Sequence, residues 1–139
     1  MTTGSTQILY GADGIKQAYE MTLKESRLDI VCLSSDYANV IGKYFDVDYG
    51  PRLFRSKIAT REVLPDTVGN RKDSVKKDQR KNQVKFIKLS KKSESDFILT
   101  NERLIFVSYN KKMPYALIID DSDLVANLKN QFDNLWERL

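Results

Sequence analysis

The chain contains no histidine and only one cysteine, Cys32. Catalytic arrangements such as Ser-His-Asp and Cys-His need an imidazole base, so this composition argues against hydrolases of those kinds. Zinc sites are built from groups of cysteine and histidine, which this sequence does not have. Cys32 lies in an apolar run, where a cysteine more often acts as a small buried hydrophobe than as a nucleophile. We therefore expect no enzyme, no metal and no other cofactor.

Long apolar runs and targeting signals are also missing. No run approaches the roughly 18 residues that are needed to cross a bilayer. The first six residues lack the basic and apolar regions of a signal peptide, and a single cysteine fits a reducing compartment. We expect a cytoplasmic protein without membrane contact. A length of 139 residues, with 41% hydrophobic and 30% charged residues, predicts a single domain over residues 1–139.

Short apolar runs alternate with segments of helical periodicity, a pattern that predicts an α/β fold. The expected architecture is a mixed β-sheet flanked by helices, with an amphipathic helix at the C-terminus. Strands are predicted over residues 7–10, 28–33, 58–64, 83–89, 96–99, 103–107 and 116–119. Helices are predicted over residues 11–23 and 37–45, in a short stretch from Arg52, and after the aspartate-rich segment 120–123.

Four local features sharpen this prediction. A turn is expected at residues 48–51, because Pro51 disfavours helix in the residue before it. The polar segment 67–82 is expected to be a mobile loop or a loosely packed helix. Residues 100–102 are expected to form a tight hairpin turn. The last helix is expected to bury Leu124, Leu128, Phe132, Leu135 and Leu139, with Val125 and Trp136 widening the stripe.

Three stretches carry a family likeness: Leu-Tyr-Gly-Ala-Asp-Gly-Ile-Lys at 9–16, Ala-Leu-Ile-Ile-Asp-Asp-Ser-Asp-Leu at 116–124, and Phe-Asp-Asn-Leu-Trp-Glu at 132–137. With its central strands, the chain resembles the effector-side domain of TrmB-type transcriptional regulators, which is similar in fold to a single phospholipase D-like unit. The likeness covers residues 8–139. It implies a regulatory sensor domain that forms a homodimer. Such regulators carry a winged helix-turn-helix ahead of this domain, and we find no room for one in this chain.

The phospholipase D pattern consists of His-x-Lys, four residues and Asp, followed by a Gly-Ser-x-Asn turn. The chemistry needs an imidazole nucleophile and a lysine that holds phosphate. Two carboxylates in their place would repel a phosphate, so the resemblance implies a pseudo-active site without phosphodiester hydrolysis. We expect this site to meet a neutral or cationic group, or nothing. In this alignment Glu94, Asp96 and Asn101 replace the His, Lys and Asp, while Ser108 and Asn110 are retained.

Aromatic residues are concentrated between residues 37 and 54. Ring faces beside carboxylates are typical of pockets for sugar-like effectors, because rings stack on the sugar and carboxylates accept hydrogen bonds from its hydroxyls. The alternative is that these aromatic side chains pack a helix on the sheet. The candidate ligand-binding residues are Tyr37, Tyr44, Asp46, Asp48, Tyr49 and Arg52.

Charge is unevenly distributed. Residues 71–92 contain ten basic and two acidic residues, a net charge of +8 in a chain whose total is +4. This segment is either a solvated surface or a contact for phosphates. A nucleic-acid-binding module is therefore one alternative function, and a partner-docking module is another. The candidate phosphate contacts are Arg71, Lys72, Lys76, Lys77, Arg80 and Lys81.

Overall fold

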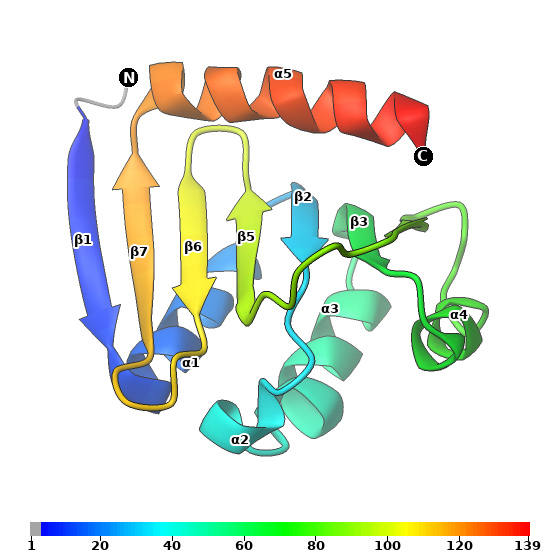
Figure 1. The fold of residues 1–139 in the computed structure, drawn as a ribbon. Helices are drawn as coiled ribbons and strands as arrows, with labels where there is room; N and C mark the ends of the chain where they lie inside the picture. Colours follow the sequence, from blue (N-terminus) through cyan, green and yellow to red (C-terminus); the bar gives the residue numbers. More distant parts are fainter. Residues whose placement is uncertain (1–3) are drawn as a thin grey trace.

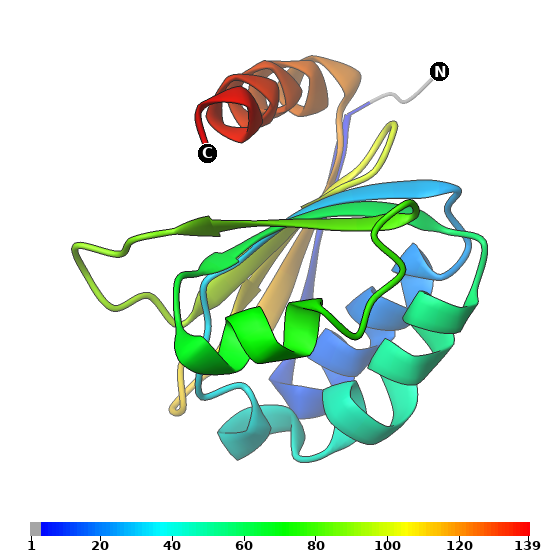
Figure 2. The same ribbon diagram turned by 90° about the vertical axis from the view of Figure 1, so that its right-hand side faces the viewer.

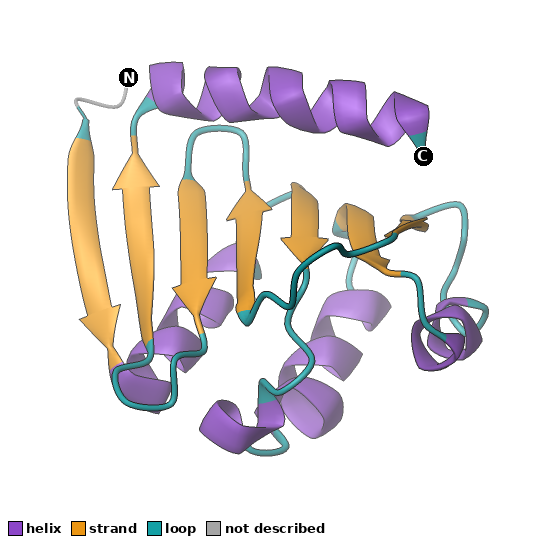
Figure 3. Ribbon diagram, viewed as in Figure 1, coloured by secondary structure: helices purple, strands orange, loops and turns teal. Residues whose placement is uncertain are grey.

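The computed structural model describes residues 4–139, and over this range the chain forms one seven-stranded sheet with helices on both faces (Figures 1 and 3). The fold is mixed α/β, as predicted. The strands are β1 Ser5–Tyr10, β2 Arg27–Cys32, β3 Ala59–Pro65, β4 Asn82–Ile87, β5 Ser95–Leu99, β6 Leu104–Ser108 and β7 Tyr115–Asp120. The helices are α1 Gly11–Thr22, α2 Ala38–Ile41, the π-helix η1 Tyr44–Tyr49, α3 Gly50–Arg55, α4 Val68–Ser74 and α5 Ser122–Arg138.

The sheet has the strand order β1-β7-β6-β5-β2-β3-β4. Strands β2, β3 and β4 are parallel to one another, and the remaining neighbours are antiparallel. Helices α1 to α4 cover one face, and α5 alone lies across the other (Figure 2). Each face has its own apolar core, since one cluster is centred on Ile15, Leu28 and Ile98 and the other on Val63 and Phe132.

The predicted hairpin and first helix are confirmed. Helix α1 buries Ile15, Ala18, Tyr19 and Thr22, the residues that helical spacing places on one side. At Gly14 a Cβ atom would lie 2.5 Å from the carbonyl carbon of Leu9, so the close strand-to-helix packing requires glycine. No helix within residues 4–139 has both the length and the hydropathy needed to cross a membrane.

The prediction for residues 37–55 was wrong about where the helices begin and end. The predicted helix over 37–45 is divided at Gly42, which has a φ of +60°, and the turn expected at 48–51 does not occur. Instead η1 continues directly into α3, and Pro51 stands in the first turn of α3. At this junction the Gly50 N–H donates to the Phe45 carbonyl across the π turn, so the hydrogen-bond pattern is already shifted where Pro51, which has no N–H, enters the helix. The wide π turn and α3 together carry the aromatic residues over the sheet.

The predicted stripe of α5 faces the sheet over most of its length, because Leu128, Leu135 and Trp136 pack into the core beside Val125 and Phe132, and the prediction is wrong at Leu124 and Leu139. Val125 and Phe132 are buried, whereas Leu124 is 47% exposed. The helix faces the sheet with a charged residue, Lys129, whose ammonium contacts the fully buried Asp29 of β2. This ion pair attaches α5 to β2, a contact that periodicity of apolar residues alone does not predict. Segment 67–82 contains α4, whose first turn is capped by a side chain, and is therefore a helix with a following turn.

Candidate functional site

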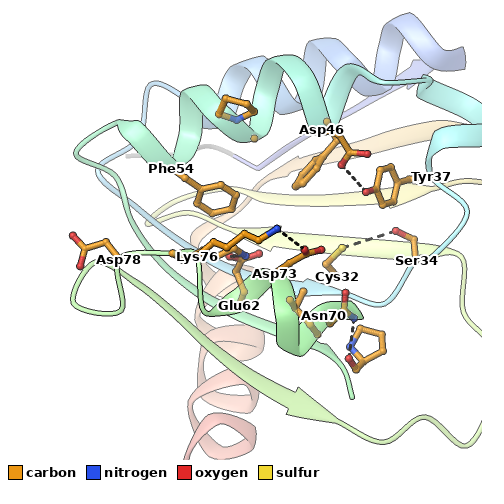
Figure 4. Close-up of a pocket in the computed structure, with 16 residues that line it drawn as sticks. Cys32, Ser34, Tyr37, Asp46, Phe54, Glu62, Asn70, Asp73, Lys76 and Asp78 are labelled. Atoms are coloured by element: carbon orange, nitrogen blue, oxygen red, sulfur yellow. Dashed lines mark hydrogen bonds and ion pairs between the residues drawn. The ribbon is translucent and has the colours of Figure 1, made fainter. Parts of the chain in front are cut away.

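A cavity of about 600 Å³ opens on the helical face, beyond the carboxyl ends of the parallel strands β2 and β3 (Figure 4). Ligands of open α/β sheets bind at such ends, because the connecting segments there diverge and leave a crevice. One wall is formed by η1 and α3, and the other by α4 and the turn that follows it. The volume lies within the range of roughly 300 to 1,000 Å³ that is usual for small-molecule pockets.

The wall from η1 and α3 is aromatic. The rings of Phe45 and Phe54 line it together with Tyr37, which follows β2. The Tyr37 hydroxyl donates a hydrogen bond to Asp46 Oδ1 at 2.8 Å. Burial, and then the Asp46 carboxylate, raise the pKa of Tyr37 well above its usual value, so Tyr37 remains a hydrogen-bond donor. This wall therefore offers ring faces and a carboxylate side by side.

The floor of the cavity holds a buried ion pair. Glu62 of β3 is only 4% exposed, and its Oε1 accepts a hydrogen bond from Lys77 Nζ at 2.8 Å. The same ammonium lies 4.4 Å from the centre of the Phe54 ring, within range of a cation–π contact. Cys32 stands beside this pair, and burial raises the pKa of its thiol well above the usual range. The thiol is therefore held in its protonated form.

The six candidate ligand residues lie in three different places in the structure. Tyr37 and Asp46 line the cavity, as placed by η1 and the loop after β2. Tyr49 is buried below it, where its hydroxyl lies 2.6 Å from Thr22 Oγ1. The other three, which form an outer cluster around Glu20 through hydrogen bonds and ion pairs, are Tyr44, Asp48 and Arg52. The prediction thus found one side of the cavity.

Sequence reasoning missed Glu62, Asn70, Asp73 and Lys77 as cavity residues. The sequence gives one signal for this group: Glu62 interrupts an apolar strand. A buried carboxylate needs a partner, so its presence there predicts one. That partner lies fifteen residues later, beyond a parallel crossover. No spacing rule links positions across such a connection.

The carboxylates of Glu94 and Asp96 are directed into the protein. Glu94 accepts hydrogen bonds from the backbone N–H of Ser35 and of Asp36, each at 3.1 Å. Asp96 accepts from the backbone N–H and the hydroxyl of Ser34, both at 3.0 Å. The two side chains together hold the loop that follows β2. Backbone N–H groups and hydroxyls thus occupy the oxygens of both carboxylates, an arrangement that fits the expectation that this site meets no ligand better than the alternative of a neutral or cationic group.

Asp96 belongs to a buried polar cluster. The hydroxyl of Tyr19 donates to its Oδ2 at 3.2 Å, and that hydroxyl lies 2.7 Å from the hydroxyl of Tyr109. Burial raises the pKa of Asp96 above its usual value, although the hydrogen bonds from Ser34 oppose this effect. The cluster joins β5, α1 and the loop after β6.

The remaining positions of the phospholipase D pattern do not all meet. Ser108 pairs with Ser95 at the start of the hairpin, near Glu94, and the exposed Asn110 follows it. Asn101 lies in the turn between β5 and β6, at the other end of both strands. Four of the five pattern positions therefore share one end of the hairpin, and Asn101 is separated from them by the length of β5.

Much of the charge in residues 71–92 is used internally. Arg71 binds Asp66 and lies over the Phe86 ring at 4.4 Å. Lys81 donates to the backbone carbonyl of Phe54 at 2.8 Å. Lys77 and Lys76 contact the acidic side chains of the cavity. Within the described part of the chain, the candidate phosphate contacts without an ion pair or such a bond are Lys72 and Arg80.

The two acidic residues that precede α5 have structural partners. Asp121 caps α5 through the N–H groups of Asp123 and Leu124, and Asp120 binds Arg103 at 2.6 Å. Among residues 4–139, no group of three or more Cys, Asp and Glu side chains is placed to hold a metal ion.

Comparisons with known proteins identify the fold. No protein-family model and no curated protein matches the chain. Among solved structures, TrmBL2, an archaeal chromatin protein described as showing a novel mode of DNA binding, has a TM-score of 0.61 and 17% identity, over 96% of this chain and 52% of that chain. NucT from Helicobacter pylori has a TM-score of 0.62 and 11% identity, over 96% of each chain. Nuc from Salmonella typhimurium, a phospholipase D family member, has a TM-score of 0.63 and 12% identity, over 96% and 95%.

These likenesses confirm the phospholipase D-like fold that TrmBL2 shares, and at such identities they show the fold alone. The chain spans about half the length of TrmBL2. They contradict the expectation that the chain is no enzyme, because phospholipase D, the family that includes Nuc, is named for an enzyme. The absence of histidine bears on mechanisms that need an imidazole, and it does not decide whether the chain has an activity.

Proposed function

We propose that the chain is a regulatory domain of the TrmB type that binds a small polar effector in the cavity between η1–α3 and α4. The observation that carries this proposal is the cavity itself, which combines aromatic faces with the buried Glu62–Lys77 pair. A buried ion pair is costly to maintain, and in a pocket it supplies fixed charges that orient a ligand. Sugar-like molecules suit this surface, because rings stack on them and carboxylates accept from their hydroxyls.

An effector in this cavity would contact two separate helical units. One unit is η1–α3, and the other is α4 with the turn that contains Lys77. Helix α4 is short, and two apolar side chains beside it, Val68 and Val75, are 78% and 77% exposed. Few apolar contacts hold this unit, so its local stability is expected to be low. A ligand that bridges the units would hold α4 in place, which is the change that a regulator transmits.

The test is thermal unfolding of the purified chain with a panel of small polar molecules that includes mono- and disaccharides and organic amines. A ligand present at 100 times its Kd stabilises the folded state by about 2.7 kcal/mol, which raises the Tm by several degrees. The variant Phe54→Ala removes one ring of the cavity and is expected to abolish the shift. Met113→Ala, at a residue 62% exposed and outside the cavity, is the control. A shift that survives Phe54→Ala, or no shift with any ligand, would contradict the proposal.

Contact with nucleic acid is a second candidate, and the DNA binding described for TrmBL2 supports it. Four exposed basic residues on the side of α4 and β4 have no ion-pair partner among residues 4–139: Lys72, Arg80, Lys88 and Lys91. Each phosphate contact contributes about −0.9 to the slope of log affinity against log salt. Replacing all four by glutamine is expected to reduce that slope by about 3 to 4. The pair Lys111→Gln and Lys112→Gln is the control, and an unchanged slope in the fourfold variant would rule this surface out.

We also propose that the chain forms a homodimer, with docking to a different partner as the alternative. Support comes from the edge strand β1, where Ile8 is 44% exposed and Tyr10 is 64% exposed. Strand β1 has no charged residue, whereas the opposite edge strand β4 carries Lys85, and charge on an edge opposes pairing. Light scattering at high micromolar concentration measures the mass directly. A monomer under these conditions would exclude the homodimer.

A further inference from the structure

The charged side chains that line the cavity do not balance. Their sum is −2, although the whole chain has a net charge of +4. These side chains come from three separate parts of the chain, so the imbalance is a local property of the cavity and not a reflection of composition. The carboxylates are Asp46, Glu62, Asp73 and Asp78, and the ammonium groups are Lys76 and Lys77.

Both ammonium groups already have partners. Lys77 binds Glu62 at 2.8 Å, and Lys76 lies 3.7 Å from Asp73. An anionic ligand would have to compete with these carboxylates for the lysines. Asp46 and Asp78 have no ion-pair partner within the described range 4–139. The charge that is left over in the cavity is therefore negative.

Lys77 shows what kind of group the floor of the cavity accepts. Its ammonium lies between the Glu62 carboxylate and the face of the Phe54 ring, 4.4 Å from the ring centre. A carboxylate and an aromatic face at these distances form a site for an organic cation. Glu62 is 4% exposed, and within residues 4–139 its second oxygen, Oε2, makes no hydrogen bond. This oxygen is therefore a free hydrogen-bond acceptor on a buried side chain.

A second open acceptor lies on the aromatic wall. Asp46 Oδ1 is occupied by the Tyr37 hydroxyl, which leaves Oδ2 without a partner among the described residues. In Figure 4 Asp46 and Tyr37 lie on one side of the space, and Glu62 and Asp73 lie on the other. The two walls thus present carboxylates toward a common volume, with the Phe45 ring beside them. A molecule held there meets negative charge from both sides.

We infer that the effector of this cavity is an organic cation, a small molecule with an amine, guanidinium or quaternary ammonium group. This inference rests on the proposed ligand-binding function and narrows it. Asp46 binds the charged nitrogen from the aromatic wall, and the rings of Phe45 and Phe54 cover it. Glu62 accepts a second donor of the ligand through Oε2. A neutral sugar would leave the negative charge of the cavity uncompensated.

Isothermal titration calorimetry at two salt concentrations tests the inference. The probes are agmatine and choline as cations, glucose and maltose as neutral ligands, and glucose 6-phosphate as an anion. We expect a cation to bind, with an affinity that falls as salt is raised. We expect Asp46→Asn to weaken that binding about tenfold, because it removes one close charge and keeps the shape. Asp13→Asn, at an exposed aspartate of α1, is the control and should have no effect.

A third variant examines the role of Lys77. In Lys77→Met the competing ammonium is gone, so cations are expected to bind more tightly than to the original chain. If glucose or maltose binds, and binds Asp46→Asn as tightly as the original chain, the cation inference is overturned and the proposed effector function is left intact. If no probe binds to any of these variants, both are overturned.

Discussion

The Glu62–Lys77 pair is expected to be worth more to stability than any ion pair near it on the surface. The side chains of Glu62 and Lys77 are 5% and 14% exposed, and their charged atoms are 2.8 Å apart. Glu62→Gln or Lys77→Met would each leave one charge in a buried position without its partner. Loss of one member of a buried pair costs about 3–5 kcal/mol, because the remaining charge keeps its desolvation cost. For a domain of this size that lowers the Tm by about 10 °C or more.

The double variant separates the interaction from the two side chains. Replacing both residues removes the unpaired charge, so it is expected to cost less than the sum of the single changes. The difference, the coupling energy, is expected to be about 2 kcal/mol. The assay is urea unfolding followed by circular dichroism, at neutral pH, for the original chain, the two single variants and the double variant.

The control is the ion pair between Arg71 and Asp66, at the start of α4. It has a similar geometry, with Nε and Oδ1 2.6 Å apart, but its arginine side chain is 58% exposed. Solvent screens such a pair, so Arg71→Met is expected to have a much smaller effect than Lys77→Met. If Lys77→Met and Arg71→Met are equally mild, Glu62 is not a buried charge, and the description of the cavity floor is refuted.

Two further changes test the loop after β2 and the attachment of α5. Glu94→Gln weakens the acceptor of the Ser35 and Asp36 N–H groups, so hydrogen exchange at these two amides is expected to accelerate while the strand amides stay protected. The pKa of Asp29 is lowered although burial alone would raise it, because hydrogen bonds from Arg61 and Lys129 outweigh burial. A lowered pKa gives stability that is present above the unfolded pKa of about 4 and is lost as pH falls through the folded pKa. Unfolding between pH 7 and 2 should therefore show a weaker pH dependence in Asp29→Asn, and an unchanged profile would contradict this assignment.

The strands and the first helix could be predicted because each has a strong local pattern. The run Leu-Asp-Ile-Val-Cys in β2 and the hairpin around residues 100–102 contain enough apolar and turn residues to define themselves. Segment 37–55 lacks such clarity. The helix is interrupted at Gly42, which has a positive φ. The turn expected at Pro51 does not form, because η1 leads directly into α3 and Pro51 lies in the first turn of α3.

The cavity was half predicted for a similar reason. Tyr37 and Asp46 were found because aromatic and acidic residues cluster locally in the sequence. Glu62 and Lys77 were missed because they meet through the parallel pairing of β3 and β4, which brings the turn after α4 back over the sheet. The contact of Lys129 in α5 with Asp29 of β2 joins residues that are one hundred positions apart in the chain. Interactions of this range follow from topology, and local spacing does not contain them.

The hairpin and the cavity are parts of one physical arrangement. Glu94 and Asp96 use their carboxylates to hold residues 34–36, and the next residue, Tyr37, enters the cavity wall and binds Asp46. Each link is a charge-assisted hydrogen bond, and such bonds resist rearrangement more than neutral ones. The carboxylates at the positions that the resemblance assigns to a nucleophile and a phosphate-binding lysine therefore set the geometry of a neighbouring pocket.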